Sequence, residues 1–228
     1  MRTLARAMIL TTAILALPAR AVDFRWSALV GTSAPTITRP GLGGRLEVVA
    51  YDVFREVPLG FSFGVGYTRV DPGDPLLARK VFVNQNTNGT PEKSGYFLDF
   101  KLDAIWFFKV KGYERVGIFG GLRHDMFRAD FRYVGGDEDF EVTADDWGLG
   151  IGARGEMRLS RRISLLGSVG LDFYPVSSLY GHDATYSSDG SSTNARDNGN
   201  GYTYTWKDAD KAINQPRLMP SLMVGLAW

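Results

Sequence analysis

Apolar and polar residues alternate one by one along residues 147–159. Six of the seven odd positions are apolar, and the even positions are Gly148, Gly150, Gly152, Arg154, Glu156 and Arg158. A period of two predicts a β-strand with one apolar and one polar face. Glycine weakens a strand and is found where something bulky comes close, so three glycines on one face indicate a crowded interior. We predict that the apolar face contacts lipid and that the polar face lines the inside of a closed transmembrane barrel.

Seven further segments alternate in the same way and are predicted to be strands. Together with 147–159 they make eight, the others being 24–31, 43–53, 59–68, 96–110, 116–126, 163–173 and 218–228. Segment 34–40 is predicted to end the first strand, because proline cannot take part in an interior ladder. Segment 43–53 has apolar residues in both phases, so its faces are left open, and a β-bulge would explain the pattern.

The connections between these segments sort into two groups by length. Those at 54–58, 111–114 and 160–162 are tight, whereas those at 34–40, 71–94, 129–145 and 175–211 are longer. In an up-and-down meander alternate connections lie at the same end, so one end is trimmed and the other is elaborated. Bacterial outer-membrane barrels have short periplasmic turns and long extracellular loops. The sequence therefore predicts an all-β protein, an eight-stranded antiparallel up-and-down transmembrane β-barrel with three sizeable outer loops.

The first 21 residues form a separate unit. Arg2 and Arg6 precede an apolar core, and Ala21 ends a small-x-small cleavage site. We predict a cleavable secretory signal peptide at 1–21 and one barrel domain at 22–228. No later run of about 18 apolar residues exists, which excludes a helical membrane protein. Beyond residue 21 the chain carries 23 basic and 25 acidic side chains and no cysteine, so its charge indicates no nucleic-acid partner.

This layout resembles the small eight-stranded outer-membrane barrels, the group that contains the transmembrane domain of outer-membrane protein A and the opacity and adhesion-type porin-like proteins. The resemblance covers essentially all of the chain after the signal, as a pattern. Val224, Leu226 and Trp228 alternate at the end of the last strand, similar to the signal that the barrel-assembly machinery reads in that family, although Phe is usual at the final position. The resemblance implies a bacterial outer membrane as the location, with outer-membrane lipid, lipopolysaccharide and that machinery as partners.

The inward phase collects equal numbers of basic and acidic side chains. They are Arg25, Arg45, Lys101, Arg123, Arg154 and Arg158, and Glu47, Asp99, Asp103, Asp125, Glu156 and Asp172. The interior of an eight-stranded barrel is just wide enough for side chains to fill it, and charges away from water must pair. We therefore predict a salt-bridged plug that fixes the register and closes the lumen. The alternative, a narrow porin-like channel for ions or small solutes, would more naturally carry one sign of charge along its wall.

Large aromatic side chains gather near the predicted strand ends. Trp26, Trp106 and Trp228 fall near the trimmed rim and Trp147 near the elaborated one, with Tyr67, Tyr96 and Tyr174 in support. This distribution predicts aromatic girdles at the two membrane interfaces. Ordinary core packing is the alternative.

His124 and His182 are the only histidines of the chain. A lipid A-modifying enzyme of the outer membrane would need one of them beside a serine, and no serine lies two or three residues from His124. His182 falls in a loop that we predict to be mobile. The spacing fits no metal site, and the acidic run 183–201 lacks the EF-hand order.

We therefore expect no catalytic site, no cofactor and no metal. The expected role is structural, in adhesion or in surface interaction, with the outer loops displayed toward an extracellular ligand. A narrow channel, a lipid A-modifying enzyme and a soluble exported barrel that binds an apolar ligand are the alternatives.

Overall fold

The computed structural model describes residues 22–36, 39–54, 56–83, 89–136, 138–193 and 204–228. The signal peptide predicted at 1–21 lies outside these residues. Within them, no helix has the length and apolar character needed to cross a membrane.

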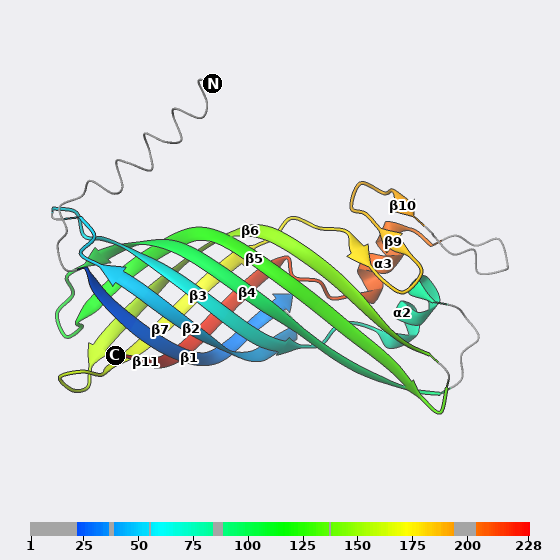
Figure 1. Ribbon diagram of the computed structural model, residues 1–228, viewed down its shortest axis with the longest axis horizontal. Coiled ribbons are helices and arrows are strands. Elements are labelled where there is room, and N and C mark those ends of the chain that lie inside the picture. The colour runs from blue at the N-terminus through cyan, green and yellow to red at the C-terminus, as the bar shows by residue number, and fades with distance from the viewer. Residues whose placement is uncertain (1–21, 37–38, 55, 84–88, 137, 194–203) are drawn as a thin grey trace, which may run out of the picture.

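Eight long strands of the described chain form a closed antiparallel barrel (Figure 1). They are β1 (Asp23–Thr36), β2 (Arg39–Tyr51), β3 (Leu59–Val70), β4 (Thr90–Phe108), β5 (Arg115–Val134), β6 (Asp139–Arg158), β7 (Ser164–Phe173) and β11 (Leu218–Ala227). Each of the first seven pairs with the next along the chain, and β11 pairs with both β7 and β1. The pairing of Ala28 with Leu226 belongs to the ladder that closes the cylinder. The predicted fold class is confirmed.

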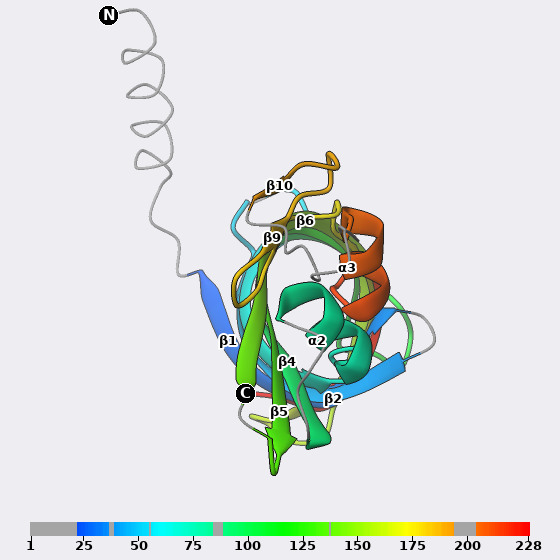
Figure 2. The same ribbon diagram turned by 90° about the vertical axis from the view of Figure 1, so that its right-hand side faces the viewer.

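The two ends of the barrel differ, as predicted. The short connections β2–β3, β4–β5 and β6–β7 lie at the trimmed end, where β1 begins and β11 ends (Figure 1). The elaborated end carries two helices and three short strands, which Figure 2 shows over the mouth of the barrel. They are α2 (Pro75–Phe82), α3 (Trp206–Ala212), β8 (Leu179–Tyr180), β9 (Thr185–Tyr186) and β10 (Ser192–Thr193). In the described chain, the additional helices and short strands therefore lie at one end of the barrel.

The prediction of a polar loop at 129–145 is wrong. β5 continues to Val134 and β6 begins at Asp139, and Arg132 pairs with Asp139 near the tip of this hairpin. β4 likewise begins at Thr90, earlier than predicted. Side chains continue to alternate between inward and outward through these residues. The polarity of the two faces is exchanged, however, because here the outer face is polar and the inner face is apolar. The outer end of the barrel thus projects as a three-stranded sheet.

The break predicted at 34–40 is also wrong. β1 continues through Pro35 to Thr36, and β2 begins at Arg39. The register of the ladder shifts between Ser33 and Thr36, so the prolines lie where the pairing is already irregular and no central ladder bond is lost. Only two of the four outer connections are therefore elaborate.

The sequence did not decide which residues of β2 point into the lumen. The pairing of β2 with β3 decides it. Leu42 to Ala50 pair residue by residue with β3, with no bulge. Arg45 and Glu47 face the lumen, and so does Val49, which is 1% exposed. Val49 packs with other apolar side chains of the lower lumen. Both phases hold apolar residues because an aliphatic side chain is used inside the barrel as well as outside.

Candidate functional site

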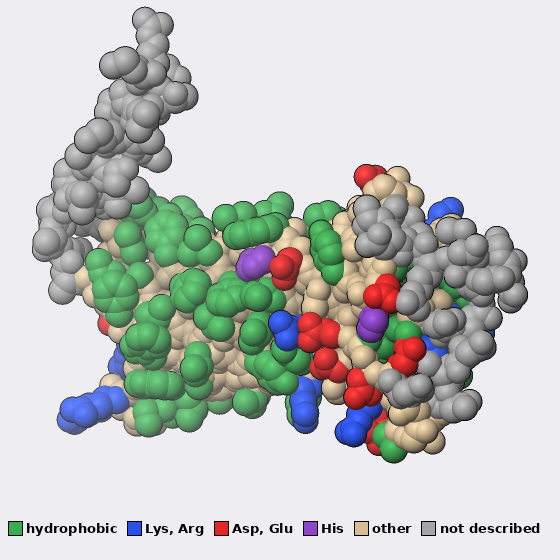
Figure 3. Space-filling view, turned by 45° about the vertical axis from the view of Figure 1, so that its right-hand side comes forward, with side chains coloured by type: hydrophobic (Ala, Val, Ile, Leu, Met, Phe, Trp, Pro, Cys, Tyr) green, Lys and Arg blue, Asp and Glu red, His purple; other side chains and the backbone are tan. Residues whose placement is uncertain are grey.

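The outer wall of the barrel is an apolar belt. Many side chains in the predicted lipid-facing phase are more than half exposed, including Leu149 at 62%, Ile151 at 66% and Leu222 at 63%, and others are exposed to a smaller extent. Hydrophobic side chains cover this wall in Figure 3, with acidic and basic side chains gathered mainly toward the elaborated end and a few at the trimmed end. Soluble monomers rarely expose an apolar surface that runs around the whole wall, and such a surface indicates contact with a membrane or another protein. The predicted assignment of the apolar phase to the outside is confirmed.

The belt ends where the alternation of β5 and β6 changes phase. On β5 the outer face is apolar up to Met126, and from Phe127 onward the inner face is apolar and the outer face is polar as far as Arg132, with Val134 at the tip as the exception. Arg128 follows on the outer face, with its guanidinium 3.1 Å from the carboxylate of Glu141 on β6. An outer face that is apolar below this point and polar above it is the arrangement that a membrane boundary at this level requires.

The middle of the lumen is filled by buried ion pairs. Arg123 on β5 donates from Nε to Asp172 on β7 at 2.6 Å and from Nη1 to Asp103 on β4 at 2.8 Å. Lys101 on β4 donates to the second oxygen of Asp172 at 2.5 Å. All four side chains are under a tenth exposed. These bonds join three strands across the interior.

Asp99 extends this central group toward β2. Its carboxylate lies 3.5 Å from Lys101 Nζ and 3.8 Å from Arg45 Nε. Opposite Asp99 in the ladder stands Gly66 of β3, where a Cβ atom would overlap the carboxylate. The glycine therefore makes room for an interior charge, as the sequence pattern indicates.

A second group of charges lies nearer the trimmed end. Arg154 bonds to Glu47 across the lumen and lies 3.2 Å from Glu156. Tyr51 donates its hydroxyl hydrogen to Glu156 at 2.5 Å. Arg25 completes the group, with its Nη1 3.9 Å from Glu156. Tyr51 was not among the predicted interior residues, because a tyrosine in either phase of β2 also fits the lipid interface.

A third group stands at the trimmed rim around Glu114, which the sequence analysis placed only in a turn. Its carboxylate accepts hydrogen bonds from Arg158 at 2.6 Å, Ser164 at 2.7 Å and Arg25 at 2.9 Å. The bond from Arg158, aided by those from Ser164 and Arg25, lowers the pKa of Glu114 to about 2. Arg158 was predicted to lie inside the barrel, but its side chain is 62% exposed at the rim. Being the last residue of β6, it extends past the wall toward solvent.

One predicted interior charge has no partner in the part of the chain that the structure describes. Asp125 on β5 is fully buried, and neither carboxylate oxygen makes a hydrogen bond there. Asp146 on β6 is 2% exposed and also faces inward, although it lies between the predicted loop 129–145 and the predicted strand 147–159. It shares the inward phase of Arg154 and Glu156, so extending the alternation upward would have identified it. Among the described residues, no group of three His, Cys, Asp or Glu side chains is arranged to hold a metal ion.

Above the charges, an apolar cap fills the outer mouth. Phe82 of α2 is fully buried and meets Tyr186 of β9 edge to face, with ring centroids 5.5 Å apart. The guanidinium of Arg79 lies 3.8 Å over the ring of Tyr133, whose hydroxyl donates to the carbonyl of Pro75 at 2.5 Å. Burial raises the pKa of Tyr133 to about 12. The described parts of the two long outer connections are therefore packed, not loose.

Six of the seven aromatic side chains predicted for the girdles lie on the outer wall of the barrel. Trp26, Trp106 and Trp228 are 56%, 43% and 53% exposed at the trimmed side of the belt. At the other side, Trp147 is 66% exposed, and the rings of Tyr67 and Tyr96 lie 5.3 Å apart.

Tyr174 was predicted to join this girdle and does not. Phe173 is the outward residue at the end of β7, so Tyr174 points inward and is 1% exposed. The alternation itself assigns Tyr174 to the inner phase, which the residue type obscured.

The two histidines lie in different parts of the described chain. His124 lies on the lipid-facing wall, stacked 4.6 Å from the ring of Trp147, with Nδ1 3.2 Å from the carbonyl of Asp146. His182 lies in the cap region, 2.9 Å from Asp183. Over the described residues, neither ring is hydrogen-bonded to a serine hydroxyl. Ala184 and Tyr186, which follow His182, are buried in the cap, and residues 194–203 of the predicted mobile loop lie outside the described residues.

Comparison with known proteins settles the fold. A major outer membrane protein from Thermus thermophilus superposes on 92% of this chain and 99% of its own, with a TM-score of 0.67 and 21% identity. This chain has the fold of a small outer-membrane β-barrel. Neisserial surface protein A and the attachment invasion locus protein Ail of Yersinia pestis cover 90% of the chain at 12% identity, with TM-scores of 0.41 and 0.43. No family model and no curated protein matches the sequence. The fold and the apolar belt of this barrel together support a bacterial outer membrane as its location.

Proposed function

We propose that this outer-membrane barrel is a closed platform that holds a rigid projection outside the cell for adhesion or other surface interaction. It does not conduct and it carries no catalytic site. The observation that carries the proposal is the change of phase on β5 and β6, because it divides the barrel into a lipid-embedded part and a water-exposed part.

Two stacked barriers support a closed lumen. The central ion pairs around Arg123 hold side chains from β4, β5 and β7 together across the interior. The cap around Phe82 lies above them and excludes water with an apolar core. A conducting path would have to break buried charge pairs and open a packed apolar layer, and each of these steps is costly.

The projection supports an interaction role. β5 continues for eight residues from Phe127 to Val134, which corresponds to roughly 26 Å at the usual rise of a strand. Its inner face packs on the cap, and its outer face carries Arg128, Asp130 and Arg132. A packed, ordered surface loses little conformational entropy on binding, so it favours recognition of an extracellular ligand.

The remaining partners follow from the outer wall. The apolar belt would contact outer-membrane lipid, and the polar surface above the boundary would contact lipopolysaccharide. Val224, Leu226 and Trp228 lie on the lipid-facing side of β11, 52%, 44% and 53% exposed. In that position the barrel-assembly machinery could read them during insertion.

Two measurements test this proposal. Purified barrel in planar bilayers should stay electrically silent, and stepwise conductance would overturn the closed lumen. Lipid vesicles carrying the barrel should adhere to a panel of immobilised extracellular-matrix proteins and sulfated polysaccharides. Adhesion should fall in the variant Arg128→Glu/Arg132→Glu and persist in Lys109→Glu/Lys111→Glu, which makes the same charge change at the trimmed end. Adhesion lost equally in both variants would argue against a specific projection.

The absence of catalysis has its own test. Lipid A from cells that express the barrel should have an unchanged mass. A changed mass that reverts in His124→Ala or His182→Ala would replace this proposal with an enzymatic one.

A further inference from the structure

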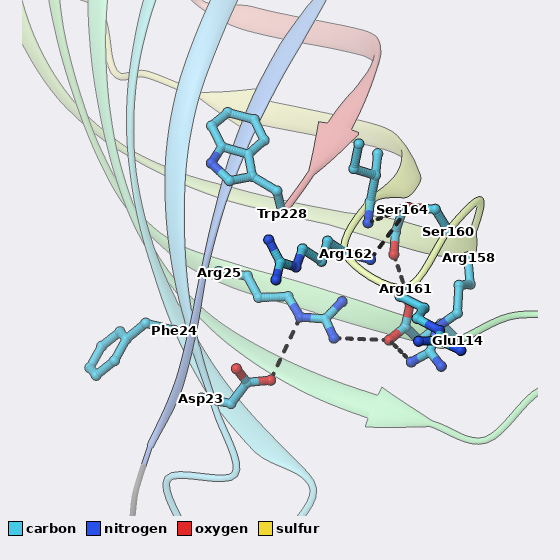
Figure 4. A pocket seen from close by; sticks show the side chains of 11 residues that line it. Asp23, Phe24, Arg25, Glu114, Arg158, Ser160, Arg161, Arg162, Ser164 and Trp228 are labelled. Atoms are coloured by element: carbon cyan, nitrogen blue, oxygen red, sulfur yellow. Dashed lines mark hydrogen bonds and ion pairs between the residues drawn. The ribbon is translucent and has the colours of Figure 1, made fainter.

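A pocket opens at the trimmed rim, away from the projection and the cap. Its volume is about 310 Å³. Figure 4 shows it between the start of β1, the connection from β6 to β7 and Trp228. The rim of the barrel is notched here, because β11 ends at Ala227 while the neighbouring connection of residues 159–163 continues past it. The notch lies where the apolar belt meets the periplasmic solution.

The charge of the pocket is unbalanced. Four arginines line it against two carboxylates: Arg25, Arg158, Arg161 and Arg162 against Asp23 and Glu114. Glu114 is ionised at any physiological pH, since its pKa is lowered to about 2, and it is already bound by two of the arginines. Arg161 and Arg162 have no carboxylate within ion-pair distance among the described residues. Two guanidinium groups are therefore available to an outside anion.

The surroundings of the pocket indicate which anion fits. Phe24 and Trp228 line it on the membrane side and are 63% and 53% exposed on the outer wall. In Figure 4, Phe24 points away from the barrel while Arg25 and Arg162 lie toward the pocket. A ligand bound here would have its charged part at the arginines and its apolar part along the aromatic side chains. A membrane lipid has this construction, and a small soluble anion does not.

We propose that this pocket binds the phosphate headgroup of an anionic phospholipid from the periplasmic leaflet, with Arg161 and Arg162 as its principal ligands. Guanidinium groups match phosphate oxygens in paired hydrogen bonds. Glu114 holds Arg25 and Arg158 in place at the base of the pocket. Basic pockets beside a membrane surface are a recognised form of lipid headgroup site. This site is independent of the role of the projection outside the cell.

The test uses the full barrel in neutral detergent and native mass spectrometry. Phosphatidylglycerol, phosphatidylcholine and glycerol 3-phosphate are titrated separately. The wild type should bind phosphatidylglycerol on the order of tenfold more tightly than phosphatidylcholine. The variant Arg161→Gln/Arg162→Gln should weaken phosphatidylglycerol binding by about thirtyfold, the combined attraction of two basic side chains for an anionic lipid. Both arginines lie in an exposed turn, so folding should be unaffected.

The matched control is Lys109→Gln/Lys111→Gln, which removes the same charge from another connection of the same rim, outside the pocket. It should leave phosphatidylglycerol binding within about twofold of the wild type. Equal weakening by both double variants would reduce the effect to general surface charge and overturn the site. Binding of glycerol 3-phosphate as tightly as phosphatidylglycerol would overturn the lipid as the ligand, since it would show that the acyl chains contribute nothing.

Discussion

Arg123 and Asp172 are joined across a strand that lies between them. Arg123 is on β5 and Asp172 is on β7, and the bond of 2.6 Å from Arg123 Nε to Asp172 Oδ1 passes over Gly150 of β6. A Cβ atom at position 150 would overlap both of these atoms. The ion pair and the glycine are therefore one structural unit, in which the missing side chain provides the space that the charges occupy.

The variant Gly150→Ala tests this unit. The added methyl group must displace a buried ion pair, and disrupting such a pair costs about 3–5 kcal/mol. We expect the free energy of unfolding in lipid vesicles, measured by urea titration, to fall by about 3 kcal/mol. Gly167→Ala on β7 is the control, because a Cβ atom there meets nothing within 4 Å. Equal effects of the two variants would mean that Gly150 matters only as a glycine in a strand.

The barrel was predictable from sequence because lipid and lumen impose opposite requirements on neighbouring residues. Ile151 must be apolar and Gly150 must be small, and this contrast repeats every second residue over the belt. Predicted interior charges such as Arg123 and Asp99 lie inside for the same reason. Their partners were not predictable, since pairing depends on strand register and on residues far apart in the chain.

The outer parts of β5 and β6 were predicted to be a loop, and that prediction was wrong. In water the apolar residues of an alternating strand point inward, whereas in lipid they point outward. Phe131 and Tyr133 alternate with Asp130 and Arg132, but here the apolar residues point inward to the cap. If the apolar phase of every strand is expected to face lipid, residues in the outward phase of this stretch are polar. The stretch therefore looked like a polar loop. The cap itself was hidden, because Phe82 packs against residues about 100 positions away, among them Tyr186.

The cap can be loosened without opening the barrel below it. Phe82→Ala removes a fully buried ring, and the loss should destabilise the cap by about 3 kcal/mol. We expect faster protease cleavage between residues 174 and 217. Under the proposed closed lumen, conductance should stay absent, because the central ion pairs remain in place. Leu76→Ala on the same helix is the control, since Leu76 is 53% exposed. Conductance in the Phe82→Ala variant would show that the cap alone closes the barrel.

The rim around Glu114 should make stability depend on acid. The pKa of Glu114 is about 2 in the folded barrel and 4.5 in its ordinary state. A carboxylate with a lowered pKa contributes stability that is full above the ordinary pKa and is lost as the pH falls through the folded one. The contribution is therefore complete above pH 4.5 and declines from there toward pH 2.

Urea unfolding from neutral pH down to about pH 3 measures this decline. The wild type should exceed Glu114→Gln in unfolding free energy at neutral pH, and the difference should shrink below pH 4.5. Glu56→Gln serves as the control, because Glu56 is an exposed carboxylate in another connection of the same rim. It should follow the wild type at every pH. A difference for Glu114→Gln that is constant with pH would contradict a role for its ionised carboxylate.

The membrane boundary on β5 can be located by placing the same charge on either side of it. Leu122 and Val134 both face outward from β5 and are similarly exposed, at 50% and 46%. Leu122 lies in the belt and Val134 lies at the tip of the projection, beyond the change of phase after Met126. An arginine on the lipid face of a barrel costs about 2–4 kcal/mol near the bilayer centre and about 0–1 kcal/mol near the interface. Leu122→Arg should therefore lower the unfolding free energy in vesicles by about 2 kcal/mol or more, whereas Val134→Arg should leave it nearly unchanged. Since the two side chains differ little in exposed fraction, only the surrounding solvent can produce that contrast, and equal costs would place both residues in the same medium.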